Sequence, residues 1–287
     1  MPMIKSRYLP IIREQAVEIR KKYGLDENTV IGDYIFTILK DQCLLLQWPD
    51  SKQLDLDGFS TERVIGGELK TVVYINSAKN LEKQNFCAAH ELGHLYSLDR
   101  LIQDRFPEDV LLPDDVEGLM NRFAAELMMP QEDFSDRSRK YLLRKAHLIS
   151  GSRYEVSLKN VLLAIIDLMN FYYVPYKAVV YRLEETDILE MDEFMCERLL
   201  AYEKKDVVNS MISRVGAFRL RTPSNKSQAS VVPDNIMKCL CDPGITKYIS
   251  RSSLKKFLEQ LGISVDVAET IQELQAMERE NINIQEE

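Results

Sequence analysis

The stretch His90-Glu91-Leu92-Gly93-His94 contains two histidines four residues apart, with a glutamate directly after the first. On an α-helix of about 3.6 residues per turn, positions i and i+4 lie on the same face, so both imidazoles can reach one metal ion. Catalytic zinc keeps three protein ligands and an open position where water becomes acidic near neutral pH. Glu91 projects about 100° away from His90, beside that position, and can act as general base. The motif therefore predicts a zinc hydrolase centre.

The residues around the motif predict a buried helix rather than a histidine-rich surface. Apolar and small residues recur at helical spacing through the motif, and His90 and His94 are two of only three histidines in the chain. The alternative is a pair of hydrogen-bonded core histidines. That alternative becomes weaker when the next helix is considered.

The segment 116–130 predicts a second helix, which Pro130 ends and which offers two carboxylates as the third ligand. Glu117 shares a face with small and apolar residues that would pack against the motif helix. Glu126 lies about 180° around the helix, and its i−4 neighbour Arg122 favours a solvated or ion-paired face. We predict that Glu117 is the ligand, and Glu126 is the alternative ligand. The alternative role for Glu117 is that of an acid in the first turn of the helix, which the helix dipole favours. Asn121, one turn from Glu117, is predicted to orient the ligands.

With these two helices in view, the sequence resembles the ImmA/IrrE family of zinc metallopeptidases. The resemblance rests on residues 74–76, 86–94 and 117–130, and it extends more weakly from about residue 11 to residue 183. Met120 departs from the alanine that is usual in the family.

The resemblance implies a gluzincin-like fold in which His90, His94 and Glu117 bind zinc and Glu91 is the catalytic glutamate. Members of the family act on helix-turn-helix repressors, often those of mobile elements or stress responses. The implied partner is therefore such a repressor.

Upstream of the motif, short apolar and alternating segments predict a small antiparallel sheet. The candidate strands are 43–47, 54–59 and 71–76, with a turn at Gly66-Gly67. In zincin-like folds an edge strand beside the motif helix pairs with an extended substrate. We predict that this edge is formed by Thr71, Val72, Val73, Tyr74 and Ile75. An ordinary hairpin strand without a bound peptide is the alternative.

Three regions are expected along the chain: a zincin-like domain at 1–150, a helix-turn-helix-like pair at 151–189 and a mostly helical extension at 190–287. Residues 137–182 carry nine Lys or Arg against two acids, a local balance of +7. Such charge could neutralise DNA phosphates. DNA contact is not favoured, because the chain as a whole carries −8 and the aromatic run 171–173 is more typical of packing.

The extension at 190–287 is expected to sense a signal or bind a partner. Residues 184–206 carry nine acids against three basic residues, which predicts a solvated connection and a boundary near residue 190. Residues 221–228 predict a linker, and residues 249–263 predict a short helix. The pair Cys239 and Cys241 lacks the second cluster that a structural zinc site requires.

Composition favours a cytoplasmic protein without a membrane partner. The five cysteines have no disulfide spacing, charged residues interrupt the first 25 positions, and the apolar runs are too short to span a bilayer.

Taken together, the sequence predicts an α+β zinc endopeptidase that cleaves a regulatory protein. The sequence does not identify the group that stabilises the oxyanion. Its candidates are Tyr172, Tyr173 and His147, each of which could equally have a structural role. The alternative function is a non-cleaving, zinc-binding anti-repressor or a signal-sensing transcriptional regulator.

Overall fold

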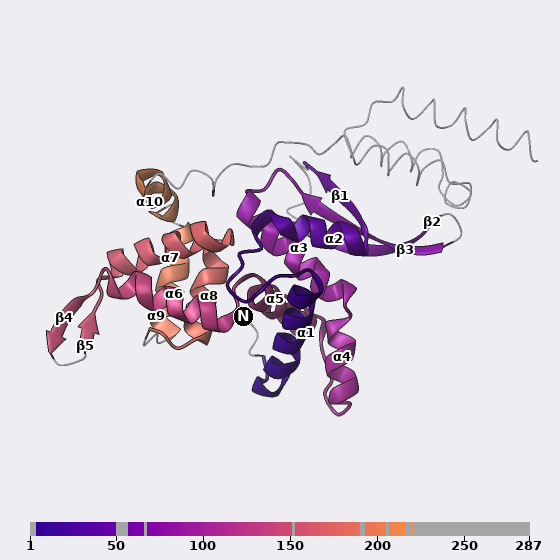
Figure 1. Cartoon of the computed structure of the whole chain (residues 1–287), viewed down its shortest axis with the longest axis horizontal. Coiled ribbons are helices and arrows are strands. Elements are labelled where there is room, and N and C mark those ends of the chain that lie inside the picture. Colours follow the sequence, from indigo (N-terminus) through magenta and orange to yellow (C-terminus); the bar gives the residue numbers. More distant parts are fainter. Residues whose placement is uncertain are drawn as a thin grey trace, which may run out of the picture. The chain divides into compact units, whose positions relative to one another are not determined.

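The computed structural model describes residues 4–49, 57–65, 68–150, 153–189, 193–204, 207–215 and 220. These residues separate into two compact units, a helical unit built from residues 4–41 and 80–220 and a sheet unit formed by residues 42–79 (Figure 1). The predicted linker at 221–228, the predicted helix at 249–263 and the pair Cys239 and Cys241 lie outside the described residues.

The sheet unit has three strands in the order β1-β3-β2. They are β1 (Leu44–Trp48), β2 (Gly58–Ile65) and β3 (Glu68–Asn76). β2 pairs with β3 in antiparallel fashion, whereas β1 pairs with β3 in parallel. The sheet is therefore mixed, and the prediction of an antiparallel sheet is wrong for β1, because β3 inserts between two strands that run in opposite directions.

The predicted substrate edge, Thr71, Val72, Val73, Tyr74 and Ile75, lies in the central strand. Val72 pairs with Leu44 on one side and Thr61 on the other. The prediction of an edge strand at this segment is therefore wrong, and β1 and β2 form the edges of the described sheet. The four consecutive apolar residues at 72–75 are typical of a strand that is covered on both faces.

The helical unit begins with two short 3-10 turns and two helices, continues with the motif helix and its partner, and ends with a group of helices from which a small hairpin projects (Figure 1). The first elements are η1 (Ser6–Tyr8), α1 (Leu9–Lys22), η2 (Gly32–Tyr34) and α2 (Ile35–Gln42). The next are α3 (Leu81–Leu95), α4 (Leu98–Arg105), α5 (Pro113–Met128) and α6 (Gln131–Leu143). The last are β4 (His147–Ser150), β5 (Arg153–Glu155), α7 (Leu158–Tyr172), α8 (Tyr176–Glu185), α9 (Glu193–Lys204) and α10 (Val207–Val215).

Helix α5 is the centre of this unit, because α1, α3 and α4 all pack against it. Its start follows from the sequence: Pro113 occupies the first turn, and the carboxylate of Asp115 accepts a hydrogen bond from the backbone N–H of Leu112 at 2.9 Å. Leu119 and Phe123 are fully buried along its inner face. The predicted second helix is thus confirmed, with a start three residues earlier than expected.

Helices α7 and α8 occupy the segment predicted to be helix-turn-helix-like. The Ser157 hydroxyl accepts a hydrogen bond from the backbone N–H of Asn160 at the start of α7, and only residues 173–175 separate the two helices. α9 packs on α8, where the Tyr176 hydroxyl donates to the Leu199 carbonyl at 3.0 Å. Residues 193–215 therefore belong to the same compact unit as the helices before them. Two consecutive helices do not by themselves define a DNA-binding motif.

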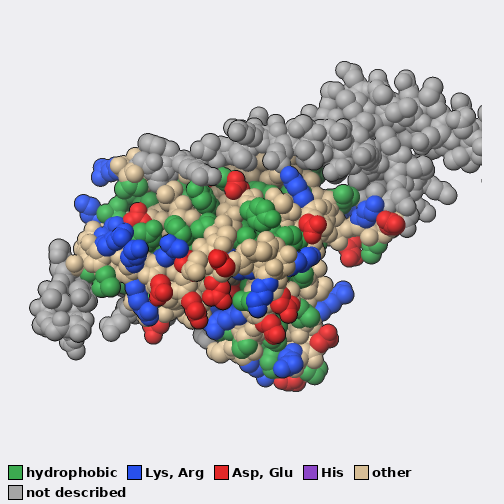
Figure 2. Space-filling view, in the orientation of Figure 1, with side chains coloured by type: hydrophobic (Ala, Val, Ile, Leu, Met, Phe, Trp, Pro, Cys, Tyr) green, Lys and Arg blue, Asp and Glu red, His purple; other side chains and the backbone are tan. Residues whose placement is uncertain are grey.

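Figure 2 shows basic and acidic side chains lying close together over much of one face. Among the described residues, no helix is both long and apolar enough to span a membrane.

Two buried arginines bind the carbonyls at the end of α5. Arg20 of α1 donates to the Leu127 carbonyl at 2.6 Å, and Arg182 of α8 donates to the Met129 carbonyl at 2.9 Å. Arg182 also pairs with the buried carboxylate of Glu126 at 2.9 Å. A cation at the C-terminal end of a helix complements its dipole and satisfies carbonyls that have no partner within the helix.

We expect Arg182→Leu to lower the free energy of unfolding by about 3 kcal/mol, because it removes a buried partner of Glu126 and leaves the Met129 carbonyl without these hydrogen bonds. Urea denaturation of the full chain measures this loss. Lys177→Leu on the exposed face of the same helix is the control, with a change within about 0.5 kcal/mol. Adding Glu126→Leu to Arg182→Leu should recover part of the lost stability. Equal losses of stability in Arg182→Leu and in the control Lys177→Leu would contradict this role of Arg182.

Candidate metal centre

Helix α3 places both motif histidines on one face. The Nε2 atoms of His90 and His94 lie 3.3 Å apart, as expected for residues one helical turn apart. Both rings are partly buried, and the larger exposed fraction, 26% of the side chain, belongs to His94. The site is therefore half-open, with its histidines presented together from the end of α3.

Helix α5 brings a carboxylate to these histidines. One oxygen of Glu117 lies 3.2 Å from Nε2 of His90, and the other lies 3.6 Å from Nε2 of His94. Ligand atoms of the three residues lie within 4.8 Å of one another, and no other group of three such side chains is found in the part of the chain that the structure describes. The three side chains predicted to bind the metal thus converge from two separate helices.

The spacing of this donor set fits zinc. Tetrahedral zinc with bonds of about 2.0–2.1 Å to nitrogen and oxygen separates its ligand atoms by about 3.3 Å. The separations between His90 Nε2, His94 Nε2 and Glu117 oxygens are 3.2, 3.3 and 3.6 Å. Two imidazoles and one carboxylate also form the ligand set of many catalytic zinc sites, which keep a fourth position open.

Glu126, the alternative ligand, lies outside this cluster. Its carboxylate is buried among arginines, 2.9 Å from Arg182 and 3.2 Å from Arg122. The ion pair between Glu126 and Arg122 that the sequence predicts on this face of α5 is present, but both side chains are buried rather than solvated. Burial lowers the pKa of Arg122 to about 10. Both arginines thus balance the Glu126 carboxylate inside the fold.

Asn121 contacts the second nitrogen of His90. Its side-chain oxygen lies 3.1 Å from Nδ1 of His90. In the tautomer that carries its proton on Nδ1, the Nδ1–H donates a hydrogen bond to this oxygen, and Nε2 is left unprotonated toward Glu117. Burial, followed by the nearby charge of His94, lowers the pKa of His90 below its ordinary 6.5. Both effects favour the neutral ring that a metal ligand requires.

Glu91 follows His90 on α3 and is 5% exposed. It is not one of the three residues whose ligand atoms gather. A buried carboxylate beside a ligand, but outside the ligand set, suits the role of general base that the sequence predicts.

Gly93 allows α3 and α5 to approach closely. A Cβ atom at this position would lie 2.7 Å from the sulfur of Met120 and 3.0 Å from the ring of Phe123. Met120 and Phe123 are both fully buried at this contact. The sequence signal for this contact is a glycine inside a helix, a position that normally costs stability.

We expect Gly93→Ala to lower the free energy of unfolding by about 1–3 kcal/mol and to weaken zinc binding, because the added methyl group pushes apart the two helices that carry the ligands. Urea denaturation and zinc titration against a chromophoric chelator measure the two effects. Met120→Ala in the Gly93→Ala background should restore part of the zinc affinity. Independent, additive losses in the double variant would contradict a direct clash.

Of the three candidates for oxyanion stabilisation, Tyr172 has another partner. Its buried hydroxyl donates to Asp133 at 2.6 Å, and burial raises its pKa further above the ordinary value. The backbone carbonyl of Tyr173 accepts a hydrogen bond from Asn85, and the side chain of His147 lies outside the described residues. Nothing in the described geometry assigns an oxyanion role to any of the three.

Two packed helices that carry His-Glu-x-x-His and a third carboxylate, together with a small mixed sheet, are consistent with an α+β zincin-like domain. Residues 46–184 match the family described as the IrrE N-terminal-like domain, Peptidase_M78. This match, over just under half of the chain, confirms the resemblance to the ImmA/IrrE family seen in the sequence.

Among solved structures, a Mycobacterium tuberculosis transcriptional regulator is similar at 16% identity with a TM-score of 0.42. The match covers 62% of this chain and 47% of the regulator, so the chain spans about half of that protein's length. A likeness at this level carries no functional argument. No curated protein matches the sequence.

Proposed function

We propose that this chain is a zinc-dependent endopeptidase that cleaves a regulatory protein, a helix-turn-helix repressor. The observation that carries the proposal is the convergence of His90, His94 and Glu117 at the spacing of zinc ligands, with buried Glu91 next to His90. Membership of a peptidase family supports the reaction type.

The residues divide the chemistry between them. His90, His94 and Glu117 would hold zinc, which supplies a Lewis acid for water and for the scissile carbonyl when it is bound. Glu91 accepts the proton of the attacking water and passes it to the leaving amine. Asn121 holds the ring of His90 so that Nε2 faces the ligand cluster.

The substrate class rests on the family resemblance, and the surface of α8 supports a protein partner over DNA. A recognition helix must present its side chains to the major groove. In α8, Arg182 is fully buried with Val179, Val180 and Leu183, which leaves Lys177 as its exposed basic residue. Two of the basic residues before α8 are also paired, Arg137 with Asp133 at 2.9 Å and Lys145 with Asp167 at 2.7 Å.

The proposal is tested by incubating the zinc-loaded full chain with the products of the neighbouring genes, among them any helix-turn-helix repressor. We expect one cut, located by mass spectrometry, which chelation abolishes and added zinc restores. A repressor that binds the zinc-loaded chain and stays intact would overturn the peptidase assignment.

A further inference from the structure

The connector between α4 and α5 contains an almost buried carboxylate, Asp109, with a side chain that is 6% exposed. Its oxygens accept hydrogen bonds from three residues of the segment that leads into α1. Lys5 donates at 2.6 Å, and Arg7 and the hydroxyl of Tyr8 donate to the other oxygen. Two cations and a phenol therefore tie the start of the described chain to a connector about 100 residues later.

The contacts of Asp109 with Lys5, Arg7 and Tyr8 form an anchor, which persists across the pH range in which histidines bind metals. Hydrogen bonds from Lys5 and Tyr8, followed by that from Arg7, lower the pKa of Asp109 from 3.8 to about 2. A lowered pKa means that the stabilisation is present above the ordinary value and is lost only as the pH falls toward 2. Phe106 adds an apolar contact, with its ring 5.5 Å from that of Tyr8.

Downstream of the anchor, the connector leads directly into the helix that carries Glu117. Three residues separate Asp109 from Pro113, the first residue of α5, and the hydrogen bond from the Leu112 N–H to Asp115 caps the start of that helix. The Glu117 side chain is 58% exposed, so its position depends chiefly on where the first two turns of α5 lie. Metal ligands must be held within about 0.5 Å of the productive geometry.

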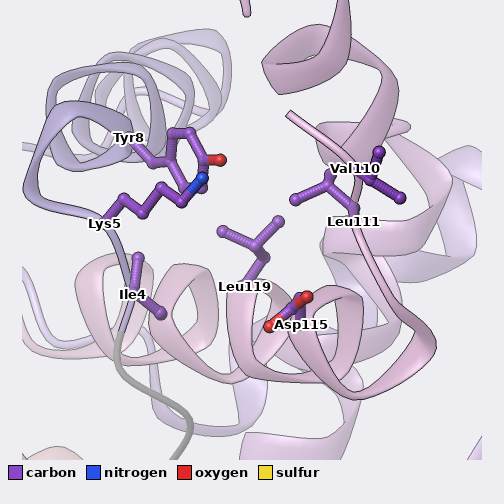
Figure 3. A pocket seen from close by; sticks show the side chains of 7 residues that line it. All are labelled: Ile4, Lys5, Tyr8, Val110, Leu111, Asp115 and Leu119. Carbon is purple, nitrogen blue, oxygen red and sulfur yellow. The ribbon is translucent and has the colours of Figure 1, made fainter. Parts of the chain in front are cut away.

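Apolar packing is incomplete at this end of α5. A small pocket of about 60 Å³ separates the initial segment from α5, as Figure 3 shows. Its walls are Ile4, Lys5 and Tyr8 on one side and Val110, Leu111, Asp115 and Leu119 on the other. Lys5 and Tyr8, which donate hydrogen bonds to Asp109, thus also line this pocket.

We propose that Asp109 is a positioning residue for the metal centre: by holding the start of α5 against the initial segment, it keeps Glu117 within ligand distance of His90 and His94. The inference rests on the proposed zinc site, and it does not require that the chain cleave anything.

The test is a double-mutant cycle on zinc affinity with the full chain. Asp109→Asn should weaken zinc binding about 10–100-fold, the loss typical of groups that orient ligands, and should weaken the visible absorption of the cobalt-loaded protein. In the Glu117→Ala background, Asp109→Asn should cause little further loss, because the ligand that it positions is gone. Glu108→Gln, which changes an exposed neighbour that pairs with Arg7 at 3.1 Å, should bind zinc normally.

Tyr8→Phe removes one of the three donors and should give a smaller loss in the same direction, which tests the inference if Asp109→Asn folds poorly. Wild-type zinc affinity in Asp109→Asn or, should that variant misfold, in Tyr8→Phe would overturn the inference. An equal loss with and without Glu117 would also overturn it. Because every readout is metal binding, absence of repressor cleavage counts against the proposed function alone.

Discussion

Glu91→Gln is expected to slow repressor cleavage about 10³-fold while zinc stays bound. Glutamine keeps the size of glutamate but cannot accept a proton, and positioned general bases contribute about 10²–10⁴-fold to such reactions. The ligand atoms belong to His90, His94 and Glu117, so the metal content should not change. Single-turnover cleavage with the chain in excess, together with zinc analysis of the same sample, measures both quantities.

Glu82→Gln provides a matched control, because Glu82 is also a buried glutamate of α3 and lies more than two turns before the motif. Cleavage by this variant should equal that of the wild type. If Glu91→Gln cleaved at the wild-type rate, Glu91 would not be the base. If it lost cleavage but still inactivated the repressor in cells, the alternative of a non-cleaving anti-repressor would be favoured.

Glu117→Ala is expected to weaken zinc binding more than 100-fold. Loss of a group that only orients ligands costs about 10–100-fold, and loss of a charged ligand should exceed that. The fold should tolerate the change, because the Glu117 side chain is largely exposed and contacts the two histidines. Competition with a chromophoric chelator gives the affinity, and urea denaturation without metal gives the stability.

Asp114→Ala is the control for this experiment, since Asp114 is an exposed acid in the first turn of the same helix. It should bind zinc like the wild type. Unchanged affinity in Glu117→Ala would show that the third ligand lies elsewhere. It would also remove the basis for the role given to Asp109.

The gathering of His90, His94 and Glu117 could be predicted because its determinants are local. An i, i+4 pair of histidines shares a face on any helix, and the helical phase separates Glu117 from Glu126 before any packing is known. Both conclusions agree with the geometry of the structure. The ends of helices follow equally local signals, such as Gly24, which adopts a left-handed conformation two residues after α1.

The order of strands depends on contacts that are distant in sequence, and here the prediction failed. A run such as Val72 to Ile75 identifies a strand but does not identify its neighbours, so the run alone does not place β3 between β1 and β2. The same limit applies to Asp109, whose partners lie more than 100 residues earlier, and to the contact between Gly93 and Met120. A charged residue in a connector and a glycine in a helix are visible in the sequence, but their partners are not.

The central claim is that two helices supply one zinc ion with two imidazoles and one carboxylate. Zinc K-edge X-ray absorption of the full chain, loaded with one equivalent of zinc, tests it most directly. The account predicts a first shell of nitrogen and oxygen at about 2.0–2.1 Å with the outer-shell scattering of two imidazoles. A sulfur ligand at about 2.3 Å, or a first shell without imidazole, would contradict it.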